Sequence, residues 1–204
     1  MISDFIGKVY NKARHRDSSD DEGKEIDKKE KITVPVTIET PKGSRNKVAF
    51  DKDKRLLKFD RMLFSAVHYP SQDGFILEPL AEDGDALDAL VLLWEPTFPG
   101  CMIEAKPIGL FKRWDEKGPD ENILCVPISD PFSNDIESLS DVPLHWLQET
   151  EPFSKNYKEL EKKQTGVEGW ENRESAIKPI TQSQQRCQKE PMKSRKTCSL
   201  HRCF

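Results

Sequence analysis

Between residues 32 and 127 the hydrophobic side chains fall in short runs that are separated by polar turns. Ile32–Ile38 is rich in β-branched residues and predicts a strand, which is closed by a turn at Pro41–Ser44. Ala89–Trp94 is an almost unbroken apolar run, which predicts a strand buried on both faces. The same pattern predicts five further short strands, at Val48–Asp51, Leu56–Phe59, Cys101–Ala105, Pro107–Trp114 and Ile123–Pro127.

Spacing typical of helices is found nearer the carboxyl end of the chain. Phe153, Tyr157 and Leu160 form one apolar stripe at helical spacing, and a shorter helix is predicted from Asn172 to Lys178, ended by Pro179. Many short strands followed by late helices are typical of a mainly-β (α+β) domain. The sequence therefore predicts a small closed β-barrel with helices packed outside it.

Polar, charged stretches at both ends of the chain predict the domain boundaries. Residues 11–31 contain Ala13 and Ile26 as their only aliphatic side chains, and residues 181–204 are mostly Gln, Ser, Lys and Arg. Such segments bury too little apolar surface to offset the entropy lost on ordering. We therefore expect a flexible charged arm over residues 1–31, a folded domain over residues 32–180 and a disordered basic tail over residues 181–204.

Charge and composition exclude several classes of function. The net charge of −4 and the isoelectric point near 5.7 argue against a general nucleic-acid-binding protein. No apolar run approaches the roughly 20 residues that cross a bilayer, and no secretory signal precedes the domain, so no membrane association is expected. Five cysteines without the spacing of a disulfide framework favour a reducing, cytoplasmic compartment.

Three carboxylates stand directly before the predicted buried strand, at Asp83, Asp85 and Asp88. Carboxylates this close in the sequence repel one another unless cations lie between them. An EF-hand calcium loop is excluded because its twelfth position needs a bidentate Glu, and Trp94 stands there. A solvated acidic turn remains the alternative to a metal site.

A second acidic group, made of Asp115, Glu116 and Asp120, follows the strand predicted at Pro107–Trp114. Oxygen ligands without nearby His or Cys favour a hard cation such as magnesium, with manganese as an alternative. The chain also holds four cations suited to phosphate, Lys47, Arg61, Lys112 and Lys158. Carboxylates for magnesium combined with Lys and Arg are the groups needed to bind a polyphosphate.

Motifs that contain these residues occur in order and at close spacing from residue 32 to residue 180: Glu39, Pro41–Lys47, Asp60-Arg61, His68–Pro70, Gly74–Ile76, Leu80–Asp85, Pro96–Cys101, Arg113–Asp120, Ile123–Pro127, Tyr157–Glu161 and Val167–Trp170. In these motifs the sequence resembles the soluble family I inorganic pyrophosphatases. The resemblance implies a five-stranded OB-like barrel and magnesium-dependent hydrolysis of inorganic pyrophosphate to two phosphates. It also implies a homo-oligomer.

The resemblance assigns roles to individual residues. The implied metal ligands are Asp83, Asp88, Asp115 and Asp120. Asp85 matches the catalytic carboxylate that accepts a proton from the attacking water. The implied phosphate-binding residues are Lys47, Arg61, Tyr157 and Lys158. Glu39 and Tyr69 match residues that line the site.

Several positions depart from the family pattern. Ala86 stands where the family usually has Pro, and three other positions lose a group of the site. Ala49 stands where the family has Glu, Asp73 where it has Tyr, and Asn122 where it has a phosphate-binding Lys. Losing one preorganised charge-stabilising group typically lowers the rate by about 10²–10³, although losses within one network need not add. Two readings follow. One is a pyrophosphatase of reduced activity, and the other is a non-catalytic descendant that binds metal or pyrophosphate or serves as an oligomer partner.

Overall fold

The structure is a computed structural model. It describes the backbone of residues 32–80 and 86–189, with side chains for residues 32–76 and 86–185. The predicted arm at residues 1–31 lies outside the described residues, and so does the tail from residue 190 onward. None of the helices in the described part is long and apolar enough to cross a membrane.

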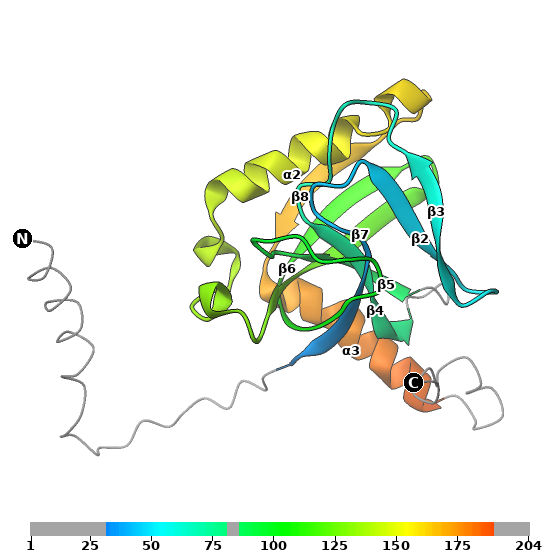
Figure 1. The fold of residues 1–204 in the computed structure, drawn as a ribbon. Coiled ribbons are helices and arrows are strands. Elements are labelled where there is room, and N and C mark those ends of the chain that lie inside the picture. Colours follow the sequence, from blue (N-terminus) through cyan, green and yellow to red (C-terminus); the bar gives the residue numbers. More distant parts are fainter. Residues whose placement is uncertain (1–31, 81–85, 190–204) are drawn as a thin grey trace, which may run out of the picture. The chain divides into compact units, whose positions relative to one another are not determined.

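Five strands form a closed ring (Figure 1), as the resemblance implied. Their order is β1-β4-β5-β7-β6, and β6 pairs back onto β1. The bounds of these strands are Val34–Thr40 for β1, Gln72–Leu80 for β4, Ala86–Val91 for β5, Met102–Asp115 for β6 and Gly118–Pro127 for β7. The pairing of β5 with β7 is parallel, and the other pairings in the ring are antiparallel. Strand β8 (Gly166–Glu171) extends the sheet from β6.

A two-stranded hairpin and several helices lie outside the ring. Strands β2 (Asn46–Asp51) and β3 (Leu56–Met62) form the hairpin, and both are longer than the sequence pattern predicted. Short 3₁₀ turns are found at η1 (Pro131–Ser133), η2 (Leu139–Asp141) and η3 (Glu159–Glu161). The two long helices, α2 (Leu144–Asn156) and α3 (Arg173–Lys189), flank the ring in Figure 1.

The apolar run is buried on both faces over residues 89–92, as predicted, but β5 begins earlier, at Ala86, and ends at Val91, and Trp94 is half exposed. Ala89 and Val91 pack in one hydrophobic cluster with Ile180 of α3. Leu90 packs in a second cluster with Trp146 of α2. A strand between two helices must be apolar on both faces, which explains why this run does not alternate with polar residues.

Helix α3 corrects two predictions. It does not end before Pro179 but continues to Lys189, so the tail predicted from residue 181 is helical over its first part. A proline inside a helix removes one hydrogen bond and costs about 3 kcal/mol. Here Ala176, Ile180 and Ser183 are fully buried at helical spacing, and their packing offsets that cost.

Helix α2 lies earlier than the predicted stripe indicated. It begins at Leu144 and ends at Asn156, so Tyr157 is its C-terminal capping residue and Leu160 lies in η3. The side chains of Phe153 and Tyr157 are nevertheless buried, as their spacing suggested, while Leu160 is exposed.

Gly74 lets β4 approach β1 closely beside a residue of the site. A Cβ atom at this position would lie 2.1 Å from the carbonyl oxygen of Thr37, which no larger residue can accommodate without moving the strand. Asp73, its neighbour, pairs with Thr40 across a register shift in β1. This irregularity brings Asp73 and the end of β1 together at one edge of the ring.

Candidate active site

The β2–β3 hairpin carries two of the predicted phosphate-binding cations. Lys47 and Arg61 are direct partners in its antiparallel register, so their side chains share one face. The Arg61 Nε donates to Glu161 Oε1 at 2.8 Å, and its Nη1 donates to Asp60 Oδ2 at 2.6 Å. The third nitrogen, Nη2, is buried without a hydrogen-bond partner among the described residues. The hairpin therefore presents a guanidinium that is fixed by carboxylates and, among the described residues, has one nitrogen left to donate to an anion.

Lys158, directly after α2, is buried against the acidic turn between β6 and β7. Its Nζ lies 2.6 Å from Asp115 Oδ2 and 3.4 Å from Glu116 Oε2. Burial alone would lower the pKa of Lys158, but the bond with Asp115 raises it. Although burial opposes ionisation of Asp115, Lys158 and the backbone N–H of Lys117 lower the pKa of Asp115. Both groups are therefore charged, and they bind each other.

Two buried tyrosines form one wall of the site. The Phe153 ring stacks on Tyr157 with centroids 5.2 Å apart, and it lies 4.9 Å from the Tyr69 ring. The Lys158 Nζ lies 5.5 Å from the centroid of the Tyr157 ring. Burial, together with the nearby Asp73 carboxylate, raises the pKa of Tyr69. Tyr69 therefore keeps its phenolic proton and remains a hydrogen-bond donor.

Several carboxyl groups share the edge of the ring. Asp88 retains solvent access, but the protein around it removes much of its hydration, and this together with Asp120 and Asp73 raises its pKa to about 7. Burial and Asp73 likewise raise the pKa of Glu39 to about 7, although the Phe50 N–H donates to its Oε1 at 2.6 Å. Burial is also the main cause that raises the pKa of Asp73. The edge therefore holds excess negative charge that a cation would relieve.

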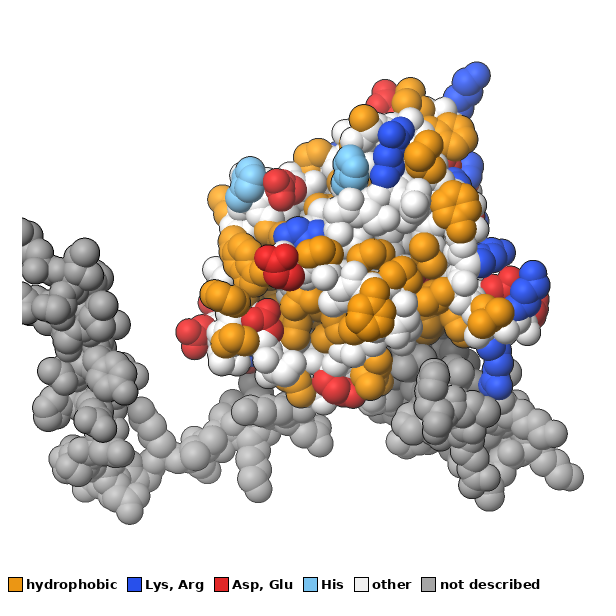
Figure 2. All heavy atoms as spheres, in the orientation of Figure 1, with side chains coloured by type: hydrophobic (Ala, Val, Ile, Leu, Met, Phe, Trp, Pro, Cys, Tyr) orange, Lys and Arg blue, Asp and Glu red, His pale blue; other side chains and the backbone are white. Residues whose placement is uncertain are grey.

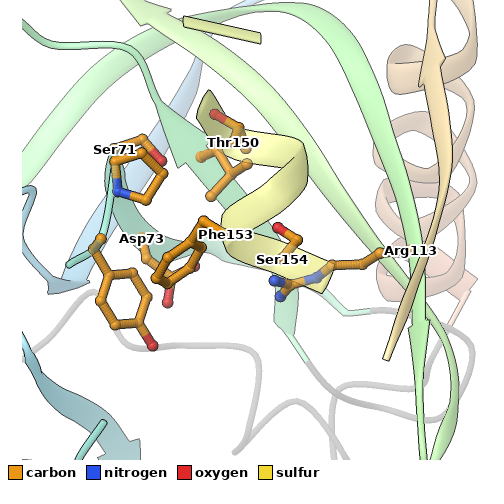
Figure 3. Close-up of a pocket in the computed structure, with 9 residues that line it drawn as sticks. Ser71, Asp73, Arg113, Thr150, Phe153 and Ser154 are labelled. Carbon is orange, nitrogen blue, oxygen red and sulfur yellow. The ribbon is translucent and has the colours of Figure 1, made fainter. Parts of the chain in front are cut away.

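Arg113 is a site residue that sequence reasoning missed. It pairs with Asp120 across β6 and β7, and its Nε lies 3.0 Å from Asp120 Oδ2. Figure 3 shows its side chain reaching from β6 toward a small pocket that Asp73 enters from β4. The signal was present in the sequence, since the two residues flank a β-turn at positions that face each other in a hairpin. Lys112, one of the four cations suited to phosphate, forms a salt bridge with Glu171 on β8, with 3.3 Å between Nζ and Oε1.

Comparisons with known proteins show the family of the chain. The sequence model of the inorganic pyrophosphatase family matches residues 36–188. The chain belongs to this family. It is 51% identical over 161 residues to the inorganic pyrophosphatase of Methanosarcina acetivorans, covering 79% of this chain and 96% of the relative. The corresponding protein of Methanosarcina mazei is 50% identical, over 74% of this chain and 89% of the relative.

Solved structures of pyrophosphatases resemble the chain in fold. The crystal structure of the inorganic pyrophosphatase from Thermus thermophilus has a TM-score of 0.72 at 37% identity, covering 80% of this chain and 94% of that one. The structure from Helicobacter pylori has the same TM-score at 36% identity, covering 76% of this chain and 92% of that one. The expected OB-like fold is confirmed.

Two of the three departing site positions, 73 and 122, lie at the acidic edge of the ring. Asn122 is fully buried, its Nδ2 donates to Asp120 Oδ1 at 2.9 Å, and its Oδ1 has no hydrogen-bond partner among the described residues. Asp73 lines the pocket beside Arg113. Ala49 lies on β2, paired with Lys58 of β3. The side chains at 73 and 122 therefore meet the same charged cluster, through Arg113 and Asp120.

The donor set fits a hard divalent cation in chemistry. Asp88, Asp115 and Asp120 offer only oxygen atoms, and the pKa of Asp88 is raised first by burial and then by the neighbouring carboxyl groups of Asp120 and Asp73. Among the described residues, however, no three His, Cys, Asp or Glu side chains converge closely enough to bind one ion. Asp83 and Asp85 lie outside the described residues. A complete ligand set would therefore need Asp83 or Asp85, or it would need Asp115 to bind metal in place of Lys158.

Proposed function

We propose that this chain hydrolyses inorganic pyrophosphate to two phosphates, with magnesium held by Asp83, Asp88, Asp115 and Asp120. The observation that carries the proposal is that carboxylates fix two cations, Arg61 through Glu161 and Lys158 through Asp115 at the acidic turn of β6 and β7. An anion surrounded by such cations is bound strongly only if metal also compensates the nearby acids.

The chain's own residues would divide the work. Arg61 offers its unpartnered Nη2 to a phosphate oxygen, with Lys47 beside it on the hairpin. Lys158 and the phenol of Tyr157, at the C-terminal end of α2, would bind the same anion. Asp85 would accept the proton of the attacking water. Bound magnesium would supply positive charge to the phosphate oxygens and lower the pKa of water at the site.

Phosphate release by the purified full-length chain tests this function. We expect release from pyrophosphate that depends on magnesium and stops when EDTA is added. Asp85→Asn should abolish it, and Arg61→Lys should raise KM about tenfold, because lysine lacks the planar fork of arginine. Arg173→Lys is the matched control, since the Nε of Arg173 donates to the Pro107 backbone carbonyl in β6.

A non-catalytic role is the second candidate, and the site residues Asp73 and Asn122 favour it, because they add an acid and remove a cation where an anion must bind. Pyrophosphate binding measured by calorimetry distinguishes the two. Binding without any magnesium-dependent phosphate release would identify a binding descendant. Release at a low rate would identify an enzyme with reduced activity.

We further propose that the chain forms a homo-oligomer in the cytoplasm. Figure 2 shows hydrophobic side chains gathered over one face of the domain. Several large side chains are more than half exposed, among them Trp94, Phe98 and Phe132, and apolar exposure on this scale is typical of protein interfaces. The free thiols of Cys101 and Cys125 are consistent with a reducing compartment. Light scattering at several concentrations would measure the oligomer.

A further inference from the structure

The guanidinium of Arg113 is surrounded by acidic groups that come from three different strands. Asp120 faces it from β7, with 3.0 Å between Arg113 Nε and Asp120 Oδ2. Asp73 of β4 shares a pocket with it, and Asp88 of β5 also interacts with it electrostatically. The Arg113 side chain is only 15% exposed, so these interactions are weakly screened by water.

Among the described residues, the other cations of the site either pair with different acids or act on only part of this group. Lys158 binds Asp115 and Glu116, and Arg61 binds Glu161 and Asp60. Lys47 on the hairpin acts on Asp73 but is not paired with Asp120. Among the described residues Arg113 is therefore the cation that Asp73 and Asp120 share.

Both carboxylate oxygens of Asp120 have a close partner, one through a hydrogen bond and the other through an ion pair. One carboxylate oxygen of Asp120, Oδ1, accepts a hydrogen bond from the Asn122 amide at 2.9 Å, and the other, Oδ2, faces Arg113. A carboxylate approached on both oxygens is restricted in its rotation. Asp120 is thus held in one orientation by a cross-strand neighbour and by a residue of its own strand.

We propose that Arg113 is a positioning residue of this site, a fixed counter-ion that orients Asp120 and balances Asp73 until magnesium enters. The inference rests on the proposed function in assigning magnesium to Asp120. It does not make Arg113 a catalytic residue, because the guanidinium acts on carboxylates and not on the substrate. The proposal predicts that Arg113 and bound magnesium stabilise the folded site in partly interchangeable ways.

Thermal unfolding of the full chain, in EDTA and in magnesium, tests this substitution. In EDTA, Arg113→Met should lower Tm by about 5 °C or more, because acids are left buried without their partner. Magnesium should then raise the Tm of Arg113→Met by more than it raises that of the wild type. Arg113→Lys keeps the charge, so its magnesium-induced shift in Tm should lie between those of the wild type and Arg113→Met. An equal magnesium shift in Arg113→Met and wild type would overturn the proposal.

Arg173→Met is the matched control, because it removes an arginine whose Nε bonds to the backbone carbonyl of Pro107. This variant should lose stability but show the same magnesium shift as the wild type. If it shows the enlarged shift as well, the effect is general destabilisation and the proposal is wrong.

A double-mutant cycle in EDTA keeps the test independent of magnesium. Asp73→Asn should recover stability in the Arg113→Met chain, and it should restore folding if Arg113→Met alone does not fold. Lack of recovery would overturn the proposal. If the wild type shows no magnesium shift while the cycle shows recovery, then the magnesium assignment fails and the pairing of Arg113 with Asp73 stands.

Discussion

Lys158 and Asp115 form a salt bridge of 2.6 Å between Nζ and Oδ2, although their proposed ligands differ. Lys158 is proposed to bind phosphate and Asp115 to bind magnesium. While the two side chains are paired, the Lys158 ammonium is not available to phosphate and the Asp115 carboxylate is not available to magnesium. Magnesium at Asp115 would release the Lys158 ammonium, so metal binding should prepare the site for pyrophosphate.

The pairing predicts how Asp115→Asn behaves. Magnesium affinity should fall about tenfold or more, because a ligand loses its charge in a shared carboxylate site. The variant should also lose stability without metal, since Lys158 would remain buried with only Glu116 as an acidic partner. Calorimetric magnesium titration and urea unfolding measure the two effects. Asp135→Asn, at an exposed position before Ile136, is the control, and magnesium affinity reduced equally in both variants would contradict the assignment.

Glu39 predicts a pH dependence of stability in the absence of metal. Its native pKa of about 7 lies above the ordinary value of 4.5, so between these values the native state holds a proton that the unfolded state releases. Stability therefore falls as the pH rises through this window, and the full penalty is present above pH 7.

Glu39→Gln removes this titration. The unfolding free energy of the variant minus that of the wild type should be larger at pH 8 than at pH 4.5. We expect this increase to be about 1–2 kcal/mol after allowance for solvent screening. Urea unfolding in EDTA at the two pH values measures the difference. Glu104→Gln, at an exposed position on β6, should show no such change. An identical pH profile for wild type and Glu39→Gln would refute the prediction.

Arg113 changes the expected result of restoring the family residue at position 122. Asn122→Lys would place a second cation on Asp120, whose carboxylate already faces Arg113. The single variant should therefore lose stability, because Asn122 is fully buried. Combined with Arg113→Met, it should regain stability and release phosphate faster than the single variant. Melting temperature and phosphate release decide this, and a single variant as stable as the wild type would count against it.

Arg113 also affects the expected result of the substitutions Ala49→Glu and Asp73→Tyr, which reinstate the family residues at these positions. Asp73→Tyr removes an acid from the anion site, but it also removes a partner of Arg113. We expect the triple variant restored at positions 49, 73 and 122 to turn over pyrophosphate faster when it also carries Arg113→Met than when it retains Arg113. About 1.4 kcal/mol of transition-state stabilisation gives a tenfold faster rate, which a phosphate assay detects.

Helix α3 predicts where the chain can be shortened. A chain that ends at residue 180 would lose buried Ser183 and the later turns of the helix, whereas one that ends at residue 189 retains them. The shorter chain should unfold at a lower temperature, since the remaining helix end carries Pro179 without the turns that follow it. Differential scanning calorimetry of both chains measures this, and equal melting temperatures would show that residues 181–189 add nothing.

Local pattern determined much of the fold. Because hydrophobic clusters cover both faces of β5 near its end, Ala89, Leu90 and Val91 had to be apolar, and this part of the run at Ala89–Trp94 could be interpreted without the structure. Helix boundaries could not be predicted in this way. The burial of Ile180 against the sheet overrides the local preference of Pro179, and no local signal reports such packing.

For the site, the sequence by itself determined which groups are present. Acids, lysines, arginines and tyrosines in the family's order identified the chemistry, and Lys47, Arg61, Tyr69 and Lys158 all lie among charged or aromatic partners of the site. Only the tertiary structure decided how their charges are paired. Arg61 meets Glu161 from an element far along the chain, and Arg113 meets Asp120 through strand register. Side-chain type is local information, whereas a charge finds its partner only when separate elements fold together.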